Sequence, residues 1–366
     1  RFMDQLFAPL GFAFVYLDDI LVASEDSSSH LLHLQQVLEV LQQNGLVLNK
    51  AKCQFFQSEV DYLGHRISAA GISPLPGGVA AVVNFPRPST VKELQGLLGL
   101  INFYRRFIPA AASILRPLTD SLKGARPGSD VLVWSEDMSS AFVTAKRMVA
   151  EATLLAHQDP TAALCLVTDA SATHVGAALQ QRRKGTVAWE PLGFFSKKLE
   201  RPQDSAFDRE LFAVFSAIRY FRSQLEGRDF EVWTDHKPLT FALHRISDPW
   251  TAKQQRQLSY VAEYTSKLRH VPGKENVVAD ALSRPPAAVG SSLQFEGGCA
   301  GPRGPDSTPP GISPPSPLPV VAAVHVLDKM VRQEGLDYAA VAAAQATCSE
   351  TVALRASPSL RVAPVQ

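Results

Sequence analysis

The sequence predicts an α+β chain with more than one domain, and three observations favour that class. Apolar runs at residues 162–167 and 230–234 have the length of buried strands, and an aspartate closely follows each of them. Between the two runs, residues 205–225 repeat apolar side chains at helical spacing. The chain has 366 residues, which is enough for two or three domains with hydrophobic cores.

Charge and composition limit the class of protein further. The formal net charge is +1, so the overall balance gives no evidence about nucleic acid. Locally, Lys and Arg outnumber Asp and Glu between residues 181 and 284, which suits a phosphodiester substrate. No run of about eighteen apolar residues is present, so we expect no membrane partner. The chain begins with Arg1 rather than Met, and we expect it to be a piece of a longer protein.

The cysteines favour an intracellular protein, in a cytoplasmic particle or in the nucleus. Because they lie far apart and show no paired metal spacing, we expect reduced thiols rather than a disulfide framework. The four are Cys53, Cys165, Cys299 and Cys348.

Four acidic residues form the candidate site. Asp169 and Asp235 follow the two strand-like runs, Glu210 lies inside the helical pattern, and Asp280 lies in a short helical pattern after a Pro-Gly turn. Carboxylates that converge repel one another and stay ionised only with cations. A pair of hard divalent ions meets that need and can activate water against a phosphodiester. Each acid alone is more often a helix cap, a turn residue or a solvated charge.

Four motifs surround these acids: TDAS (168–171), FDREL (207–211), WTDHKPL (233–239) and HVPGKENVVADALSR (270–284). In this order they resemble the ribonuclease H domain of Pol polyproteins from gypsy-type LTR retrotransposons. The resemblance implies a five-stranded mixed sheet with flanking helices and cleavage of the RNA strand of an RNA–DNA hybrid. It also implies two Mg²⁺ ions, with Mn²⁺ as a substitute, bound by Asp169, Glu210, Asp235 and Asp280.

His270 matches the position of a mobile histidine that, in related domains, helps the product to leave or moves protons. The alternative is a loop histidine without a role.

Residues 12–23 read as a strand, a tight turn and a second strand, with two adjacent acids at the turn. Residues 16–19, YLDD, resemble the palm motif of reverse transcriptases, which implies a polymerase site with Tyr16 and the metal ligands Asp18 and Asp19. The family's third palm carboxylate has no match, because Asp4 is the sole acid before Tyr16. We therefore expect no primer extension by this chain alone, and RNA-directed DNA polymerase activity only in its full-length parent. A helix is expected at 27–43 and a hairpin at 60–67.

Residues 91–107 are expected to form a helix with an apolar face, and aromatic residues flank Arg105 and Arg106 at its end. The thumb of reverse transcriptases has the same motif, and such interleaving suits a nucleic-acid backbone. Core packing with exposed arginines explains it equally well. The expected apolar face comprises Leu94, Leu97, Leu98, Ile101 and Tyr104.

Further nucleic-acid contacts are expected from Lys237, in the third motif, and from Lys253 and Arg256. The last two lie on a polar helix at 250–257, before an expected strand at 259–268. Exposed basic residues on a helix are also ordinary without such contacts.

The expected organisation is a partial reverse-transcriptase palm at 1–73, a thumb at 74–118, a connection at 119–160 and the ribonuclease H domain at 161–284. Residues 285–319 are rich in Pro and Gly and are expected to be a disordered linker. Residues 320–366 are expected to be a short helical or disordered tail.

Three functions remain open. The first is a hybrid-cutting nuclease, the second an inactive nucleic-acid-binding remnant of a retroelement, and the third an interaction protein that uses the Pro-rich tail. An RNA–DNA hybrid is the expected partner, and another Pol subunit or a second copy of the chain is an additional one.

Overall fold

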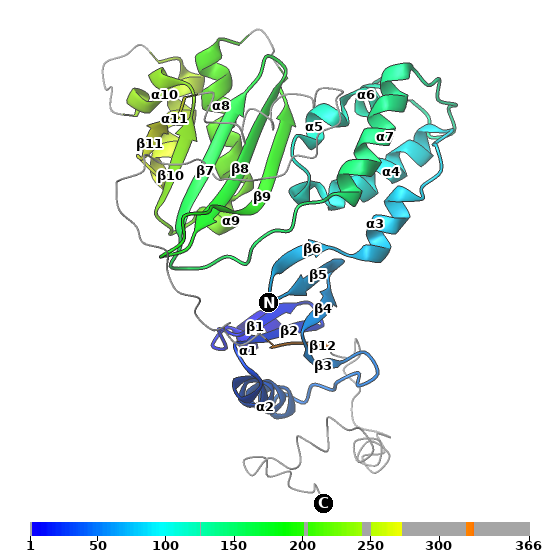
Figure 1. Ribbon diagram of the computed structural model, residues 1–366, viewed down its shortest axis with the longest axis vertical. Coiled ribbons are helices and arrows are strands. Elements are labelled where there is room, and N and C mark those ends of the chain that lie inside the picture. The colour runs from blue at the N-terminus through cyan, green and yellow to red at the C-terminus, as the bar shows by residue number, and fades with distance from the viewer. Residues whose placement is uncertain (1, 125, 201–203, 244–249, 273–319, 326–366) are drawn as a thin grey trace, which may run out of the picture. The chain divides into compact units, whose positions relative to one another are not determined.

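The computed structural model describes residues 2–124, 126–200, 204–243, 250–272 and 320–325. The chain divides into two compact units, residues 1–70 with 308–366 and residues 71–307. The described strands form a four-stranded, a five-stranded and a three-stranded sheet, and the last has the order β4-β5-β6 (Figure 1). None of the helices described is long and apolar enough to cross a membrane.

The first unit is built around the antiparallel strands β1 (Ala13–Tyr16) and β2 (Asp19–Ser24). Leu17, in the turn between them, has a φ of 54°, so the turn uses a left-handed residue. The predicted strand, turn and strand are therefore confirmed. The unit also contains α1 (Phe2–Phe7), α2 (Ser27–Gln43), β3 (Gln54–Gln57), β4 (Glu59–Tyr62) and β5 (His65–Ser68).

Helix α2 begins and ends where the sequence predicts. The carboxylate of Asp26 caps it by accepting the backbone N–H groups of Ser28 and Ser29, each at 2.8 Å. Its buried side packs on the hydrophobic core of the unit through Leu34, Val37 and Leu41. The predicted hairpin at 60–67 is also confirmed, as β4 pairs antiparallel with β5.

The expectation of helical structure at the start of the tail is wrong. Val320–His325 form a strand, β12, which lies between β2 and β3 and pairs antiparallel with both, so the sheet order is β1-β2-β12-β3. Three valines in six residues favour a strand. The backbone groups along β2 and β3 supply hydrogen-bond partners that a helix at this place would leave unused.

The second unit begins with a helical part. Strand β6 (Gly71–Pro74) exchanges backbone hydrogen bonds with Leu155, and a Cβ at Gly71 would lie 2.2 Å from the Leu155 carbonyl oxygen, so only glycine fits there. The helices are α3 (Pro76–Val83), α4 (Val91–Phe103), η1 (Arg105–Phe107), α5 (Ala111–Ile114), α6 (Arg116–Asp120) and α7 (Glu136–Ala150).

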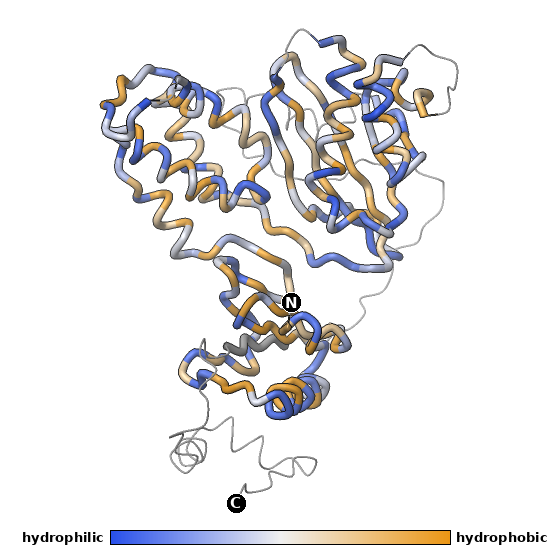
Figure 2. Tube along the Cα trace, turned by 180° about the vertical axis from the view of Figure 1, so that it is seen from behind, coloured by the Kyte–Doolittle hydropathy of each residue, from blue (hydrophilic) through white to orange (hydrophobic). Residues whose placement is uncertain are grey.

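The apolar face predicted for residues 91–107 is buried, from Leu94 to Tyr104. The α-helix itself is shorter than predicted, because α4 ends at Phe103 and Arg105–Phe107 form a 3₁₀ turn. Hydropathy along the helices alternates between polar and apolar, as expected for helices with one buried face (Figure 2).

The predicted five-stranded mixed sheet is confirmed. Its order is β11-β10-β7-β8-β9, with β10 parallel to both β7 and β11, and β8 antiparallel to both β7 and β9. The strands are β7 (Ala163–Ala170), β8 (His174–Arg182), β9 (Glu190–Lys198), β10 (Phe230–Thr234) and β11 (Leu268–His270).

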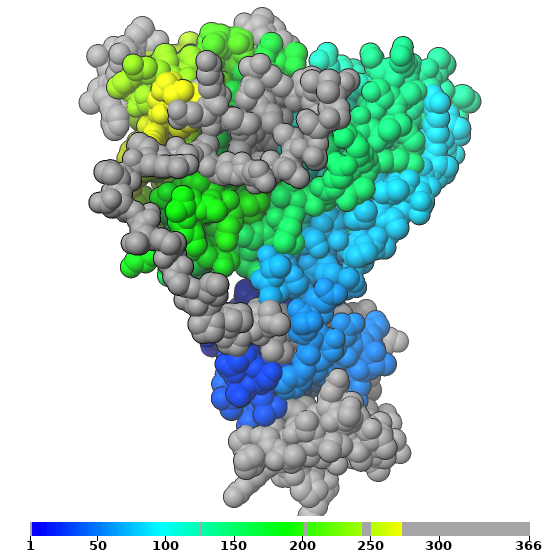
Figure 3. Space-filling view, in the orientation of Figure 1, coloured from blue at the N-terminus to red at the C-terminus, as the bar shows by residue number. Residues whose placement is uncertain are grey.

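Helices cover both faces of this sheet. Leu164 and Leu166 of β7 pack with α8 (Ala206–Tyr220) and α11 (Ala252–Tyr264) in one core. On the other side, Ala178 and Phe194 belong to the core of the helical part. Figure 3 shows the helical part and the sheet as one continuous surface. Two short helices, α9 (Arg222–Leu225) and α10 (Lys237–Ala242), complete the unit.

The strand predicted at 259–268 is wrong over most of its length. Helix α11 continues to Tyr264, and β11 starts only at Leu268. Leu258 and Val261 lie three residues apart and are both buried against α8, so helical packing overrides the β-preference of the Tyr and Val residues.

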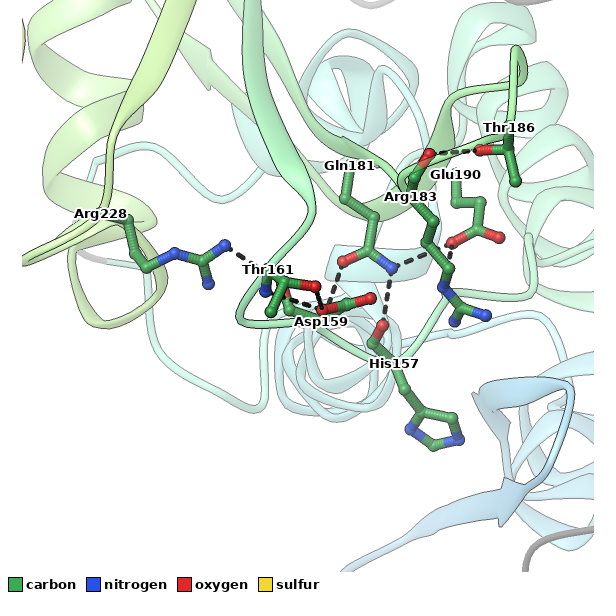
Figure 4. A network of polar contacts seen from close by, with 8 residues as sticks. All are labelled: His157, Asp159, Thr161, Gln181, Arg183, Thr186, Glu190 and Arg228. Atoms are coloured by element: carbon green, nitrogen blue, oxygen red, sulfur yellow. Dashed lines mark hydrogen bonds and ion pairs between the residues drawn. The ribbon is translucent and has the colours of Figure 1, made fainter. Parts of the chain in front are cut away.

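A polar network fixes the end of the sheet at which β7 begins (Figure 4). The fully buried Gln181 donates to the His157 carbonyl at 2.7 Å and to Glu190 at 2.9 Å, and accepts the Asp159 N–H at 2.9 Å. Arg228 donates to the Asp159 carbonyl at 3.1 Å. The network therefore holds the segment before β7 against β8 and β9.

Candidate active site

Strands β7 and β10 bring two aspartates to one end of the sheet. The strands are parallel with Trp233 beside Val167, and each continues with Thr-Asp: Thr168-Asp169 and Thr234-Asp235. Because parallel neighbours in register end side by side, the two carboxylates follow matching backbone positions.

Helix α8 supplies the third acid. Ser205 caps the helix by accepting the N–H of Asp208 at 3.1 Å, and Glu210 lies in its second turn. The N–H of Ala170, at the end of β7, donates to Glu210 Oε1 at 3.1 Å. The hydroxyl of Thr234 donates to Oε2 at 3.5 Å. Both oxygens of Glu210 are thus held by the ends of the strands that position the aspartates.

The three carboxylates converge as predicted. Asp169, Glu210 and Asp235 each place an oxygen within 4.8 Å of the others, and they are the one such acidic group in the part of the chain that the structure describes. Asp169 is 6% exposed and Glu210 is 5% exposed, whereas Asp235 faces solvent. Burial, and then the negative charges of Asp169 and Asp235, raise the pKa of Glu210 to about 8.

This donor set fits a hard divalent cation. All donors are carboxylate oxygens, the class that Mg²⁺ and Mn²⁺ bind. A bound cation would offset the burial and the mutual repulsion that raise the pKa of Glu210.

Two other predicted site residues lie at or beyond the end of the described sheet. His270 is the last residue of β11 and is exposed, and its backbone lies in register with Thr234, next to Asp235. The Val271 N–H donates to the Thr234 carbonyl at 2.9 Å, which fixes this neighbourhood. Asp280 lies outside the described residues.

Thr234 and His236 also belong to the site, although neither was predicted as a site residue. Thr234 is fully buried, and its Oγ1 also accepts the N–H of His236 at 3.1 Å. The imidazole Nε2 of His236 is buried without a hydrogen-bond partner, and burial lowers the pKa of this histidine. The repeated Thr-Asp pair was a usable signal for Thr234.

Four of the five basic residues predicted to contact nucleic acid make contacts within the chain, Arg256 with the carbonyl of Ala252 one turn earlier. Arg105 donates to the Ser196 carbonyl, Arg106 donates to the Leu192 carbonyl at 3.2 Å, and burial lowers the pKa of both. These two arginines therefore attach η1 to β9. Lys253 pairs with Asp204 at 2.8 Å, whereas Arg256 and Lys237 are exposed on α11 and α10. Contact of the five with nucleic acid stays a prediction.

The predicted polymerase residues lie on the β1–β2 hairpin. Tyr16 ends β1, Asp18 lies in the turn and Asp19 opens β2. Tyr62 of β4 donates to the Asp19 carbonyl at 3.2 Å, and burial, then the Asp19 charge, raise the pKa of Tyr62 to about 12. The hairpin thus places Asp18 and Asp19 at adjacent positions of its turn, and their role as metal ligands stays a prediction.

Two protein families match the chain. The family described as "Reverse transcriptase (RNA-dependent DNA polymerase)" matches residues 1–67. The family described as "RNase H-like domain found in reverse transcriptase" matches residues 134–232, a range that starts within the expected connection and contains Asp169 and Glu210.

Curated relatives are polyproteins of transposons. The chain is 32% identical to the Transposon Tf2-3 polyprotein of Schizosaccharomyces pombe over 274 residues, 74% of this chain and 20% of the relative. It is 36% identical to the Retrovirus-related Pol polyprotein from transposon 297 of Drosophila melanogaster over 288 residues, 78% of this chain and 26% of the relative. The chain thus spans about a fifth to a quarter of their length.

Solved structures share the fold. The foamy viral protease-reverse transcriptase in complex with RNA/DNA hybrid has a TM-score of 0.63 at 20% identity, covering 85% of this chain and 40% of that one. A form called dRH, in complex with double-stranded DNA, has a TM-score of 0.64 at 21% identity, covering 74% and 47%.

The five-stranded mixed sheet, with three carboxylates where β7, β10 and α8 meet, defines an RNase H-like protein. The hairpin unit before it adds a reverse-transcriptase part. The chain belongs to the Pol polyproteins of retrotransposons, as the resemblance predicted.

Proposed function

We propose that the second unit hydrolyses the RNA strand of RNA–DNA hybrids endonucleolytically and depends on Mg²⁺. The observation that carries this proposal is the convergence of Asp169, Glu210 and Asp235 within 4.8 Å. The RNase H-like family match and the hybrid bound to a protein of the same fold support the choice of substrate.

The residues of the proposed site have different roles. Asp169 and Glu210 are buried and held by the strand ends, so they give the site a fixed geometry. Asp235 faces solvent, where a phosphodiester can approach. Two Mg²⁺ ions, with Mn²⁺ as a substitute, would be held by these acids and would supply charge neutralisation and an activated water. Asp280 is proposed as a fourth ligand, and His270 as a residue that moves protons or helps the product to leave.

The nucleic acid is proposed to contact the basic residues of the second unit. Lys237 and Arg256 are exposed on α10 and α11, the helices that flank the acids. Lys253 would exchange its pairing with Asp204 for a phosphate. Arg105 and Arg106 are the weaker candidates, because their guanidinium groups already bond to β9.

RNA-directed DNA polymerase activity is proposed only for the longer Pol polyprotein. The hairpin offers Asp18 and Asp19, and the sequence offers no match for the third palm carboxylate. Another Pol subunit or a second copy of the chain would have to supply it. Incorporation of labelled nucleotide on a primed template by this chain, absent in Asp18→Ala, would contradict the proposal.

A gel assay with labelled RNA–DNA hybrid tests the nuclease. We expect wild type to cut the RNA strand with Mg²⁺ and not with EDTA, and Asp235→Asn to bind the hybrid without cutting it. Binding without cleavage by wild type would identify an inactive remnant. Neither binding nor cleavage would favour an interaction protein that uses its Pro-rich tail.

A further inference from the structure

Basic side chains gather where α6 meets the end of β9. Asp120 of α6 accepts from Lys198 Nζ at 2.7 Å, and it also pairs with Lys123 Nζ at 3.2 Å and Arg116 Nε at 3.6 Å. We call these four residues the Asp120 cluster. Three cations around one carboxylate leave two positive charges uncompensated within the cluster.

The cations of the cluster reach solvent. Arg116 is 47% exposed, Lys123 68% and Lys198 38%. A contact that only tied α6 to β9 would need a single cation for Asp120, and Lys198 alone meets that need. The other two cations add repulsion, which a bound anion would offset.

A buried histidine lies beside the cluster. His174 starts β8, pairs in register with Lys198 and is 2% exposed. Burial, and then the charges of Arg116 and Lys198, lower the pKa of His174 to about 4. The imidazole therefore stays neutral at physiological pH and adds no charge to the cluster.

The cluster lies at the same end of the sheet as the acids. Asp169 pairs with Gly176, and Gly176 pairs with Ser196, two residues before Lys198. Lys198 lies two strands across the sheet from Asp169 and two residues further along β9, so their backbones are roughly 12 Å apart. A duplex covers that distance in about four base-pair steps. A hybrid whose RNA reaches the acids and whose axis follows this end of the sheet from β7 to β9 would therefore extend over the cluster.

We propose that the Asp120 cluster binds backbone phosphates of the nucleic-acid substrate a few base pairs from the scissile bond. The identity of this ligand rests on the proposed function. Exposed cations at the edge of the sheet would attract the negatively charged phosphates. Asp120 orients the cations in this arrangement, so it is a positioning residue.

The test compares two charge-matched double variants of the full chain. Arg116→Gln with Lys198→Gln removes two cations of the cluster. Arg222→Gln with Lys267→Gln removes two exposed cations that pair with Glu226 and Asp229, far from the acids. Binding of a labelled RNA–DNA hybrid is measured by fluorescence anisotropy in EDTA over a series of KCl concentrations.

We expect the cluster variant to bind the hybrid several-fold more weakly. The plot of log binding constant against log salt concentration should become less steep by about 2, and the control should match wild type. The single variant Lys123→Gln, at the most exposed position, should make the slope less steep by about 1. If all proteins show the same slope and the cluster variant differs only in its melting temperature, the proposal is wrong. The Asp120 cluster would then be an internal ion-pair network.

The outcome is separable from that of the nuclease assay. Loss of binding in the cluster variant, together with a wild type that does not cut, sustains the phosphate site and refutes the hydrolysis. If wild type cuts the hybrid and the cluster variant binds it as wild type does, the hydrolysis is supported and the phosphate site is refuted.

Discussion

The hydroxyl of Thr234 donates to Oε2 of Glu210 at 3.5 Å, so the end of β10 holds the acid that α8 supplies. The hydroxyl oxygen of Thr234 also accepts the N–H of His236 at 3.1 Å, which turns the chain sharply after Asp235. One buried side chain thus links the positions of two of the three carboxylates.

Replacement of Thr234 by Val should lower hybrid cleavage by roughly tenfold, because Glu210 loses a partner and the chain after Asp235 loses its anchor. Thr234→Ser keeps the hydroxyl and should retain most of the activity. Cleavage rates at saturating Mg²⁺ give the comparison. Equal rates for the Val and Ser variants would show that the contact is unimportant.

The pKa of Glu210 makes the stability of the metal-free protein depend on pH. Glu210 loses its proton near its ordinary pKa of 4.5 in the unfolded chain and near 8 in the folded chain. Between these values the folded state binds more protons, so the free energy of unfolding falls as pH rises. This contribution is largest below pH 4.5 and is lost by pH 8.

Denaturant unfolding in EDTA across this pH range should show the decline, and Glu210→Gln should flatten it. Addition of Mg²⁺ should stabilise wild type more at pH 8 than at pH 5, because the cation offsets the repulsion. Identical pH profiles for wild type and Glu210→Gln would exclude Glu210 as the source.

Local signals in the sequence were enough to predict most elements and the convergence of Asp169, Glu210 and Asp235. The Thr-Asp pairs at 168–169 and 234–235 end parallel strands, and Asp26 caps α2 within its own turn. Contacts between residues that lie far apart in the chain could not be predicted from the sequence. The backbone of β9 holds Arg105 and Arg106, and the sequence does not show which strand an arginine will meet. Helix α11 replaced the expected strand because α8 offers it an apolar partner.

The polar network around Gln181 leads to a stability prediction. Gln181→Leu removes the amide that bonds to the His157 carbonyl, the Asp159 N–H and Glu190, so three hydrogen bonds of a buried side chain are lost. We expect a loss of about 2–4 kcal/mol in the free energy of unfolding of the second unit. Gln158→Ala, which removes an exposed bond to the Gln224 carbonyl, is the control and should cost less than about 1 kcal/mol. A similar cost for both substitutions would contradict the assigned role.

Strand β12 makes the stability of the first unit depend on the far end of the chain. Because β12 is paired on both sides, with Ala322 opposite Val22 of β2, proline at Ala322 removes an N–H from the middle of the strand and distorts the ladder. Ala322→Pro should therefore destabilise the first unit by on the order of 1–3 kcal/mol and speed hydrogen exchange in β2 and β3. Ala322→Gly keeps the N–H and should cost only about 0.5–1 kcal/mol. Unchanged exchange in β2 with the proline variant would mean that the sheet holds together without this strand, whereas selective loss of protection in β2 and β3 would establish that residues 320–325 complete it.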